Sequence, residues 1–131
     1  MMAAQILIVD DEADVEQLVT QKFRRQIRQG DMAFLFAHDG LEALAILDET
    51  PSIDIVLSDI NMPRMDGLTL LNQLNERHKD LKTVIVSAYG DMSNIRTAMN
   101  RGAFDFVTKP IELDDLEATI TKTLDHLRIF K

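Results

Sequence analysis

Polar side chains that could carry out chemistry follow four short apolar stretches of this sequence. They are Asp10 and Asp11 after QILIV, Asp59 after IVLS, Ser87 after KTVIV, and Lys109 after FDFVT. Three carboxylates packed together repel one another, which raises their pKa values unless a cation lies between them. An ammonium and a hydroxyl group beside such a cation are suited to contact an anion. We therefore expect a site that holds a metal ion and a phosphoryl group together.

The metal that suits this set of ligands is Mg²⁺. All of the ligands are oxygens, which favours a hard cation, and Mg²⁺ takes one or two carboxylates, several waters and a phosphate oxygen. Calcium prefers a more enclosing cage, and the sequence contains no EF-hand loop pattern. An aspartate carboxylate can also accept a phosphoryl group covalently. Asp59 is the candidate acceptor, with Lys109 and Ser87 as contacts for phosphoryl oxygens that the metal does not reach.

These residues come together only if the stretches between them fold into alternating strands and helices. Short apolar runs predict strands at 5–9, 32–37, 53–57, 82–86 and 104–107. Helical spacing of apolar residues predicts helices at 14–29, from 40 to just before Pro51, after Asp66, at 91–101, and from 112 onward. Asp66 is a suitable N-cap, and Gly30 and Gly102 are suitable helix stops. The residues expected to face the core are Val15, Leu18, Val19, Phe23 and Ile27 in the first helix, Leu68, Leu71 and Leu74 in the third, and Ile95, Ala98 and Met99 in the fourth.

The alternation of strands and helices places this chain in the α/β class. We expect a single domain, 1–131, with a flavodoxin-like, doubly wound (βα)5 fold and a five-stranded parallel sheet in the order 2-1-3-4-5. The carboxyl ends of parallel strands lie at one edge of the sheet, and ligands bind there. The three acids, Ser87 and Lys109 should therefore converge at that edge, although they are scattered along the chain.

The composition excludes several other kinds of site. Without cysteine there is no disulfide, no thiolate nucleophile and no cysteine-based zinc site. The net charge of −8 argues against binding of nucleic acid, and no apolar run is long enough to cross a membrane. The three histidines, His38, His78 and His126, form no local metal site, and we expect them on the surface. The start of the chain lacks a signal-peptide pattern, so a cytoplasmic protein is expected.

The motifs ILIVDDE, LSDINMPRMDG, VSAYG and FVTKP, in this order, resemble the receiver domains of two-component response regulators. The resemblance extends over nearly the whole chain. It implies a regulatory domain rather than an enzyme, in which a partner histidine kinase phosphorylates Asp59 in a Mg²⁺-dependent reaction. It also implies that Asp11, Asp59 and the backbone carbonyl of Asn61 bind the metal directly, and that Asp10 binds it through a water.

The same resemblance implies a conformational switch. Ser87 would be the switch hydroxyl, Lys109 the phosphate partner, and the Lys109–Pro110 peptide bond would be cis. Phe106 stands where the family often has a tyrosine as its aromatic switch residue, and it lacks the hydroxyl group of tyrosine. Movement of Ser87 and Phe106 would remodel the face formed by the fourth helix, the fifth strand and the fifth helix. The alternative for Phe106 is a plain strand side chain, partly exposed at the sheet edge.

Other protein classes fit the sequence less well. A haloacid-dehalogenase-like phosphatase needs a second Asp two residues after its nucleophile, whereas Asp10 is followed at that spacing by Glu12, and the chain has no room for a cap domain. A flavodoxin-like FMN carrier needs a phosphate loop rich in Ser, Thr and Gly after the first strand, whereas this chain has DDEAD. A Walker loop is absent. The remaining alternative is a degenerate receiver that binds partners without phosphorylation, although none of the five pocket residues is missing.

The last predicted helix, about 112–131, has an apolar stripe that continues to the end of the chain. The stripe consists of Leu113, Leu116, Ile120, Leu124, Leu127 and Phe130. Its spacing is also that of a coiled-coil seam, and the chain ends in LRIFK without a helix stop signal. We therefore expect this helix to continue into a linker to a C-terminal effector domain. We also expect phosphorylation to act partly through a homodimer formed along the fourth and fifth helices.

Overall fold

The computed structural model describes residues 3–62 and 64–130, with side chains as far as Leu127. Its elements follow one another in the order β1 (Ala4–Val9), α1 (Ala13–Lys22), α2 (Arg24–Arg28), β2 (Met32–Ala37), α3 (Gly40–Glu49), β3 (Ile55–Asp59), α4 (Gly67–Arg77), β4 (Lys82–Ala88), α5 (Met92–Asn100), β5 (Asp105–Lys109) and α6 (Leu113–Phe130). Strands and helices alternate as the sequence predicts, except that the first helical region is divided into α1 and α2.

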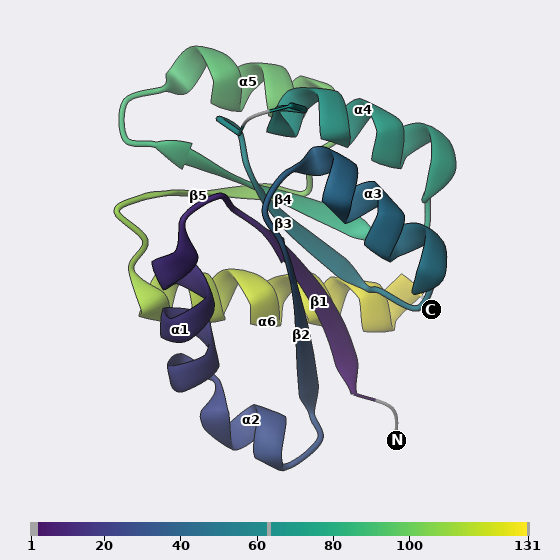
Figure 1. Cartoon of the computed structure of the whole chain (residues 1–131), viewed down its shortest axis with the longest axis vertical. Helices are drawn as coiled ribbons and strands as arrows, with labels where there is room; N and C mark the ends of the chain where they lie inside the picture. The colour runs from purple at the N-terminus through teal and green to yellow at the C-terminus, as the bar shows by residue number, and fades with distance from the viewer. Residues whose placement is uncertain (1–2, 63, 131) are drawn as a thin grey trace.

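The five strands form one parallel sheet in the order β2-β1-β3-β4-β5 (Figure 1). The predicted fold class and strand order are therefore confirmed. Since all strands run in the same direction, the carboxyl ends of β1, β3, β4 and β5 lie at one edge. Asp59 and Lys109 lie at this edge, as the last residues of β3 and β5.

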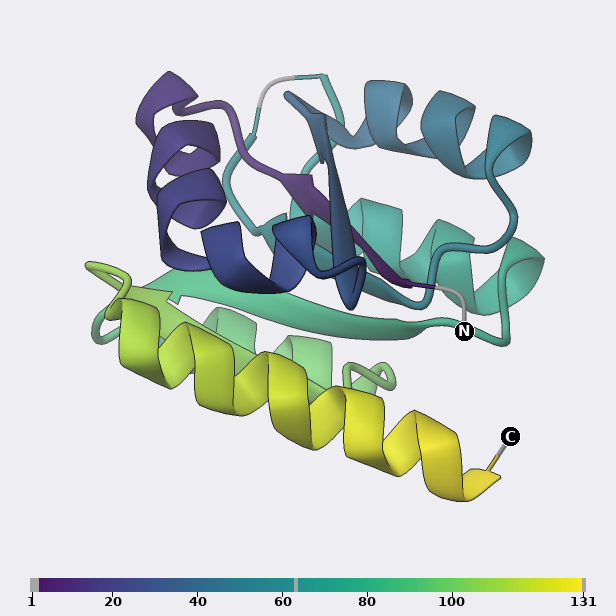
Figure 2. The same cartoon turned by 90° about the horizontal axis from the view of Figure 1, so that it is seen from below.

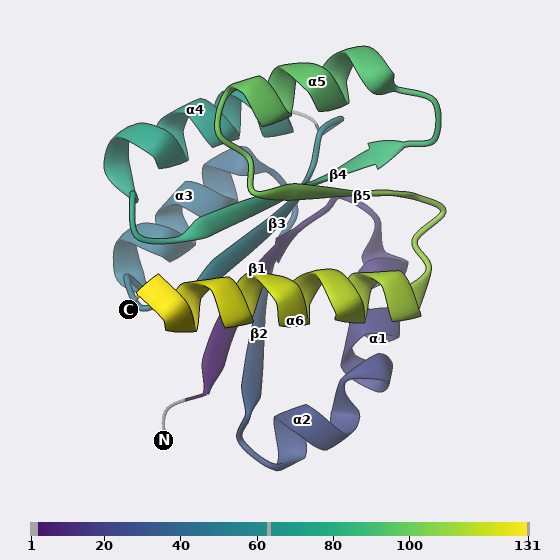
Figure 3. The ribbon, with the colours of Figure 1, turned by 180° about the vertical axis from the view of Figure 1, so that it is seen from behind.

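Helices cover both faces of the sheet, and the buried side chains divide between the faces. On one face α1 and α6 pack over Ile6, Ile8 and Leu57. On the other face α3 and α4 pack over Leu7 and Val56, and α5 extends the cover toward β4. Figure 3 shows α6 lying across the sheet on the side opposite α3 and α4. Every residue of β3 is buried, as expected for a central strand covered on both faces.

The first helical region contradicts the predicted helix at 14–29. The helix ends at Lys22, and Phe23, with φ −102° and ψ 20°, separates it from the short helix α2. Phe23 is completely buried, as expected, and its ring centroid lies 5.1 Å from that of Phe34 in β2. Leu18 and Ile27, which were expected in the core, are instead 49% and 36% exposed.

The other helices bury most of the residues that their spacing predicts. In α4, Leu71 and Leu74 are buried as expected, but Leu70 takes the core position predicted for Leu68, which is only partly covered. Met99 of α5 was also misassigned and is 38% exposed. The stripe of α6 is buried at Leu116, Ile120, Leu124 and Leu127, whereas Leu113 is partly buried. The side chain of Phe130 lies outside the described residues.

The histidines are less exposed than the sequence suggested. His38 is exposed, as expected, but His78 and His126 are partly buried. The Nε2 atom of His78 lies 3.4 Å from Asp48, and the ring of His126 packs 4.8 Å from that of Phe104. None of the helices in the described part of the chain is long and apolar enough to cross a membrane.

Candidate functional site

Three carboxylates meet at the carboxyl edge of the sheet. Asp10 and Asp11 directly follow β1, and Asp59 ends the neighbouring strand β3. Each of the three contributes one carboxylate oxygen to a group whose members all lie within 4.8 Å of one another. Asp10 and Asp59 are buried, at 7% and 5% exposure, whereas Asp11 is exposed. This set of oxygen ligands is open to solvent on one side. It therefore suits a cation that keeps part of its water shell, as Mg²⁺ usually does.

Lys109 joins the cluster from the end of β5. Its Nζ lies 2.9 Å from Oδ2 of Asp59, 3.3 Å from Oδ2 of Asp10 and 3.2 Å from Oε1 of Glu12. Burial alone would lower the pKa of Lys109, but the hydrogen bond with Asp59 and the charges of Asp59 and Asp10 outweigh it and raise that pKa. Lys109 therefore stays protonated and balances part of the negative charge. The contact between Lys109 and Glu12 was not predicted from the sequence.

The pKa of Asp10 is raised, and burial is the main cause. The hydrogen bond that its Oδ1 accepts from the backbone N–H of Glu12, at 2.8 Å, and the charge of Lys109 act in the opposite direction. Repulsion by Asp59 raises the pKa further but is a smaller cause. The predicted repulsion between the acids thus acts on Asp10 as expected, but burial, which the sequence did not indicate, contributes more.

Ser87 lies in β4 and is completely buried, but its hydroxyl does not contact Asp59. Its Oγ donates instead to Oδ2 of Asp91, at 3.2 Å, and Nδ2 of Asn94 donates to the same oxygen, at 2.9 Å. Asp91 is the N-cap residue of α5, yet its side chain makes no capping hydrogen bond to the helix. Its carboxylate instead accepts the hydrogen bonds from Ser87 and Asn94. The sequence placed Ser87 at the correct edge but offered only a weak signal for its partner, an acid four residues further on.

The loop that follows Asp59 folds back onto it. The backbone N–H of Asn61 donates to Oδ1 of Asp59 at 3.3 Å, and the backbone N–H of Gly67 donates to the carbonyl of Ile60 at 2.8 Å. A Cβ atom added at Gly67 would overlap the carbonyl oxygen of Asp59, so glycine is required here. Asp66 caps α4 as predicted, accepting from the backbone N–H of Thr69. The exposed Asn61 thus lies next to the acidic cluster.

Phe106 lies in β5 and is 37% exposed. It borders a shallow surface depression together with Tyr89, which is 86% exposed, and the segment 107–110. The Lys109–Pro110 peptide bond is cis, as the family resemblance implied. Phe106 is therefore on the outer edge of the sheet, close in sequence to the lysine but separate from the acidic cluster.

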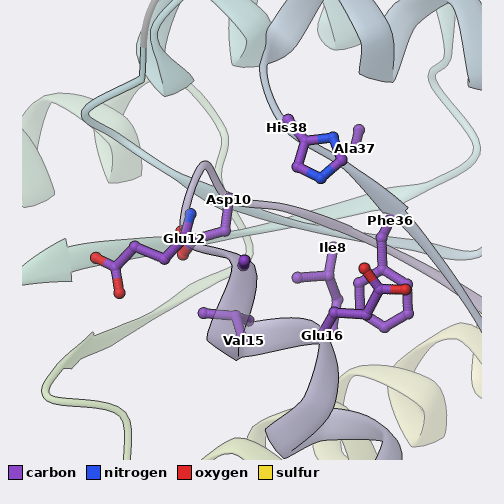
Figure 4. A pocket seen from close by; sticks show the side chains of 9 residues that line it. Ile8, Asp10, Glu12, Val15, Glu16, Phe36, Ala37 and His38 are labelled. Carbon is purple, nitrogen blue, oxygen red and sulfur yellow. The ribbon is translucent and has the colours of Figure 1, made fainter.

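A small recess adjoins Asp10 between the start of α1 and the ends of β1 and β2 (Figure 4). Its floor is apolar, formed by Ile8, Val15 and Phe36, and its rim carries acidic side chains. Figure 4 shows the carboxylate of Glu12 directed away from His38. Since His38 is the only basic side chain among the described residues that line it, the recess is poorly suited to hold an anion.

Comparison with known proteins agrees with this geometry. The family model described as the response regulator receiver domain matches residues 6–121. The chain belongs to the response regulator receiver domain family. It is therefore a regulatory signalling domain, and its membership sets aside the phosphatase and FMN-carrier alternatives.

Relatives of this receiver domain include proteins of very different length. It is 32% identical over 127 residues to the DNA-binding transcriptional regulator NtrC of Escherichia coli K12, covering 96% of this chain and 26% of that protein. It is 33% identical over 125 residues to the sporulation initiation phosphotransferase F of Bacillus subtilis, covering 95% of this chain and 96% of the relative. The chain thus spans about a quarter of one relative and nearly all of the other.

Solved structures show the same fold. A response regulator receiver domain protein from Clostridium thermocellum superposes with a TM-score of 0.87 at 28% identity, covering 98% of this chain and 99% of that one. NtrX from Brucella abortus superposes with a TM-score of 0.86 at 33% identity, covering 98% of this chain and 28% of NtrX.

Proposed function

We propose that this receiver domain is a Mg²⁺-dependent phosphoacceptor whose acceptor residue is Asp59. The observation that supports this most directly is the meeting of three carboxylates with the ammonium of Lys109, which lies 2.9 Å from Asp59. Asp11, Asp59 and the backbone carbonyl of Asn61 would hold Mg²⁺ directly, and Asp10 would hold it through a water. Bound Mg²⁺ would neutralise charge on the acceptor and on the incoming phosphoryl group.

The phosphoryl donor is a phosphohistidine of a sensor histidine kinase. A carboxylate oxygen of Asp59 attacks phosphorus, the N–P bond breaks, and the electron pair returns to the imidazole nitrogen of the donor, which leaves an acyl phosphate on Asp59. Lys109 contacts a phosphoryl oxygen through the ammonium group that it now directs at Asp59. The protein contributes position and charge neutralisation rather than an acid or base.

Phosphorylation then changes the partner of Ser87. Its buried hydroxyl leaves Asp91 and donates to a phosphoryl oxygen on Asp59, which draws the end of β4 toward the site. Phe106 shifts with it and alters the face formed by α5, β5 and α6, which are the fourth helix, fifth strand and fifth helix expected from the sequence. The change is a population shift between two packings, biased by the added charge of the phosphoryl group.

The relatives support the partners that we propose. One relative, 35% identical over 124 residues, is the sensor kinase CckA of Brucella abortus, and another is the transcriptional regulator NtrC. For this chain we propose a histidine kinase as donor, an effector domain beyond α6, and a homodimer along α5 and α6. We place the protein in the cytoplasm, where a kinase that uses ATP would reach it. A degenerate receiver is opposed by the complete set of pocket residues.

Intact-mass spectrometry tests the proposal. With Mg²⁺ and acetyl phosphate, the wild-type protein should gain the mass of one phosphoryl group, and EDTA should prevent the gain. Asp59→Asn should abolish it. Asp66→Asn is the matched control, since it changes an acid in the same loop but keeps an oxygen that can cap α4. An unchanged yield in Asp59→Asn, or a gain that persists in EDTA, would contradict the proposal.

A further inference from the structure

Arg64 ties the loop between β3 and α4 to the start of α3. Its Nε donates to Oδ2 of Asp39 at 2.7 Å, and its Nη2 contacts the same oxygen. Asp39 is only 5% exposed and is the N-cap of α3, where its Oδ1 accepts from the backbone N–H of Glu42 at 2.9 Å. One buried carboxylate therefore fixes the start of a helix with one oxygen and the loop with the other.

The backbone around this contact is also tightly placed. Arg64 has φ +65°, in the left-handed region that side chains other than glycine seldom adopt. A Cβ atom added at Gly40, next to Asp39, would lie 2.8 Å from Cγ of Met65. Arg64 and Met65 of the loop thus both pack closely against the start of α3. Figure 2 shows this loop beside the connection from β2 to α3.

The anchored loop is the one that carries Asn61. Its beginning is joined to Asp59 through the backbone N–H of Asn61, and its end is closed by the bond from Gly67 to Ile60. Of its described residues, 60–62 and 64–66, Arg64 is the one that forms an ion pair. Besides its two backbone bonds, the loop that carries Asn61 is thus joined through Arg64 to another part of the chain, the segment after β2.

We propose that Asp39 and Arg64 are positioning residues that hold the Asn61 loop in the geometry required for Mg²⁺ binding. This inference rests on the proposed function, in which Asn61 supplies a metal ligand. Neither residue would touch the metal. Their contact would limit the motion of the loop, so that the carbonyl of Asn61 is already near Asp59 and Asp11 before Mg²⁺ binds.

Two substitutions separate this role from other roles of the same residues. Asp39→Asn keeps an oxygen for the N–H of Glu42, so the cap of α3 is preserved while the charge that attracts Arg64 is removed. Arg64→Gly removes the guanidinium and places glycine at a positive φ, which glycine tolerates. Arg77→Ala is the matched control, because Arg77 of α4 pairs with Asp48 of α3 at 3.0 Å and thus joins the same two helices.

Calorimetric titration with MgCl₂, combined with a thermal melt of each variant, is the test. Loss of an outer contact to a metal ligand commonly weakens metal binding about 10- to 100-fold, and since Arg64 acts through a loop we expect the Kd for Mg²⁺ to rise roughly 3- to 10-fold in Asp39→Asn and Arg64→Gly. Arg77→Ala should change the Kd by less than about twofold, because the metal-binding loop keeps its outer contact.

The outcomes separate this inference from the function on which it rests. If the wild-type protein binds no Mg²⁺, the proposed function fails. If the wild type binds Mg²⁺ and both loop variants bind it equally well, the positioning role is overturned. If Arg77→Ala weakens binding as much as they do, the effect belongs to general packing of α3 on α4, and the inference is again overturned. If Arg64→Gly does not fold, the Kd of Asp39→Asn, in which the cap of α3 is intact, decides whether the positioning role holds.

Discussion

The hydrogen bond between Ser87 and Asp91 should restrain the switch, and removing Asp91 should release it. In the structure the buried hydroxyl of Ser87 donates to Asp91 at 3.2 Å, while its proposed acceptor after phosphorylation lies at Asp59. Asp91→Ala removes the competing acceptor. It costs α5 no capping bond, since the side chain of Asp91 makes none. The variant should therefore favour the arrangement in which Ser87 faces Asp59.

The size of the effect follows from one hydrogen bond. Bonds to charged groups contribute about 1.5–3 kcal/mol, and because this one is long and Asp91 is partly exposed we take about 1 kcal/mol. This corresponds to a shift of about fivefold in the equilibrium between the two positions of Ser87. A phosphate mimic such as beryllofluoride selects the activated position, so its apparent affinity should rise by up to about fivefold.

The assay is a beryllofluoride titration in Mg²⁺, followed through the backbone amide signals of the site. Ser87→Ala supplies the second arm of a double-mutant cycle, since Asp91→Ala should have no effect once the hydroxyl is absent. Asn94→Ala removes the other group bonded to Asp91 and should leave the affinity close to that of the wild type. If Asp91→Ala leaves the beryllofluoride affinity unchanged, or raises it equally in the Ser87→Ala background, the bond between Ser87 and Asp91 does not restrain the switch.

Three further predictions concern the cluster and the output face. Asp10→Asn should raise Tm by a few degrees at neutral pH. Burial raises the pKa of Asp10, so the stability contributed by its neutral carboxyl group is present below pH 3.8 and is lost as the pH rises through the raised pKa. In melts from acid to neutral pH, the difference in Tm between the variant and the wild type should therefore grow as the pH rises. Asp11→Ala should weaken Mg²⁺ binding more than Asp10→Ala, because it removes a direct ligand, and titration with MgCl₂ measures the difference. Lys109→Ala should still bind Mg²⁺ but lose the conformational change at Phe106 on addition of beryllofluoride, which the backbone amide shifts report. Sedimentation with beryllofluoride should show a dimer formed along α5 and α6, and a monomer at high concentration in both states would remove that proposal.

The fold was predictable because its signals are strong and local. Each strand is a short apolar run, helical patterns separate the runs, and parallel pairing then leaves few possible topologies. This is why the sequence alone placed Asp10, Asp11, Asp59 and Lys109 at one edge. The break at Phe23 was not predictable, since the helical spacing of Val19, Phe23 and Ile27 continues across it.

The finer contacts of the site could not be predicted, because they depend on rotamers and loop conformations. Ser87 was placed correctly, but its bond to Asp91 requires knowledge of where α5 begins. The pair of Asp39 and Arg64 joins two loops 25 residues apart, and Arg64 has a positive φ, which no spacing rule indicates. The contact between Glu12 and Lys109 joins residues 97 positions apart and depends on the rotamers of two long side chains, which the sequence does not indicate.

The most direct test of the account is chemical mapping of the phosphorylated residue. An acyl phosphate on aspartate is reduced by borohydride to homoserine, which peptide mass spectrometry can locate after digestion. After treatment with acetyl phosphate and Mg²⁺, we expect homoserine at position 59 and at no other acid of the cluster. Homoserine at position 10 or 11, or no homoserine in a protein that has gained a phosphoryl group, would contradict the assignment of Asp59 as the acceptor.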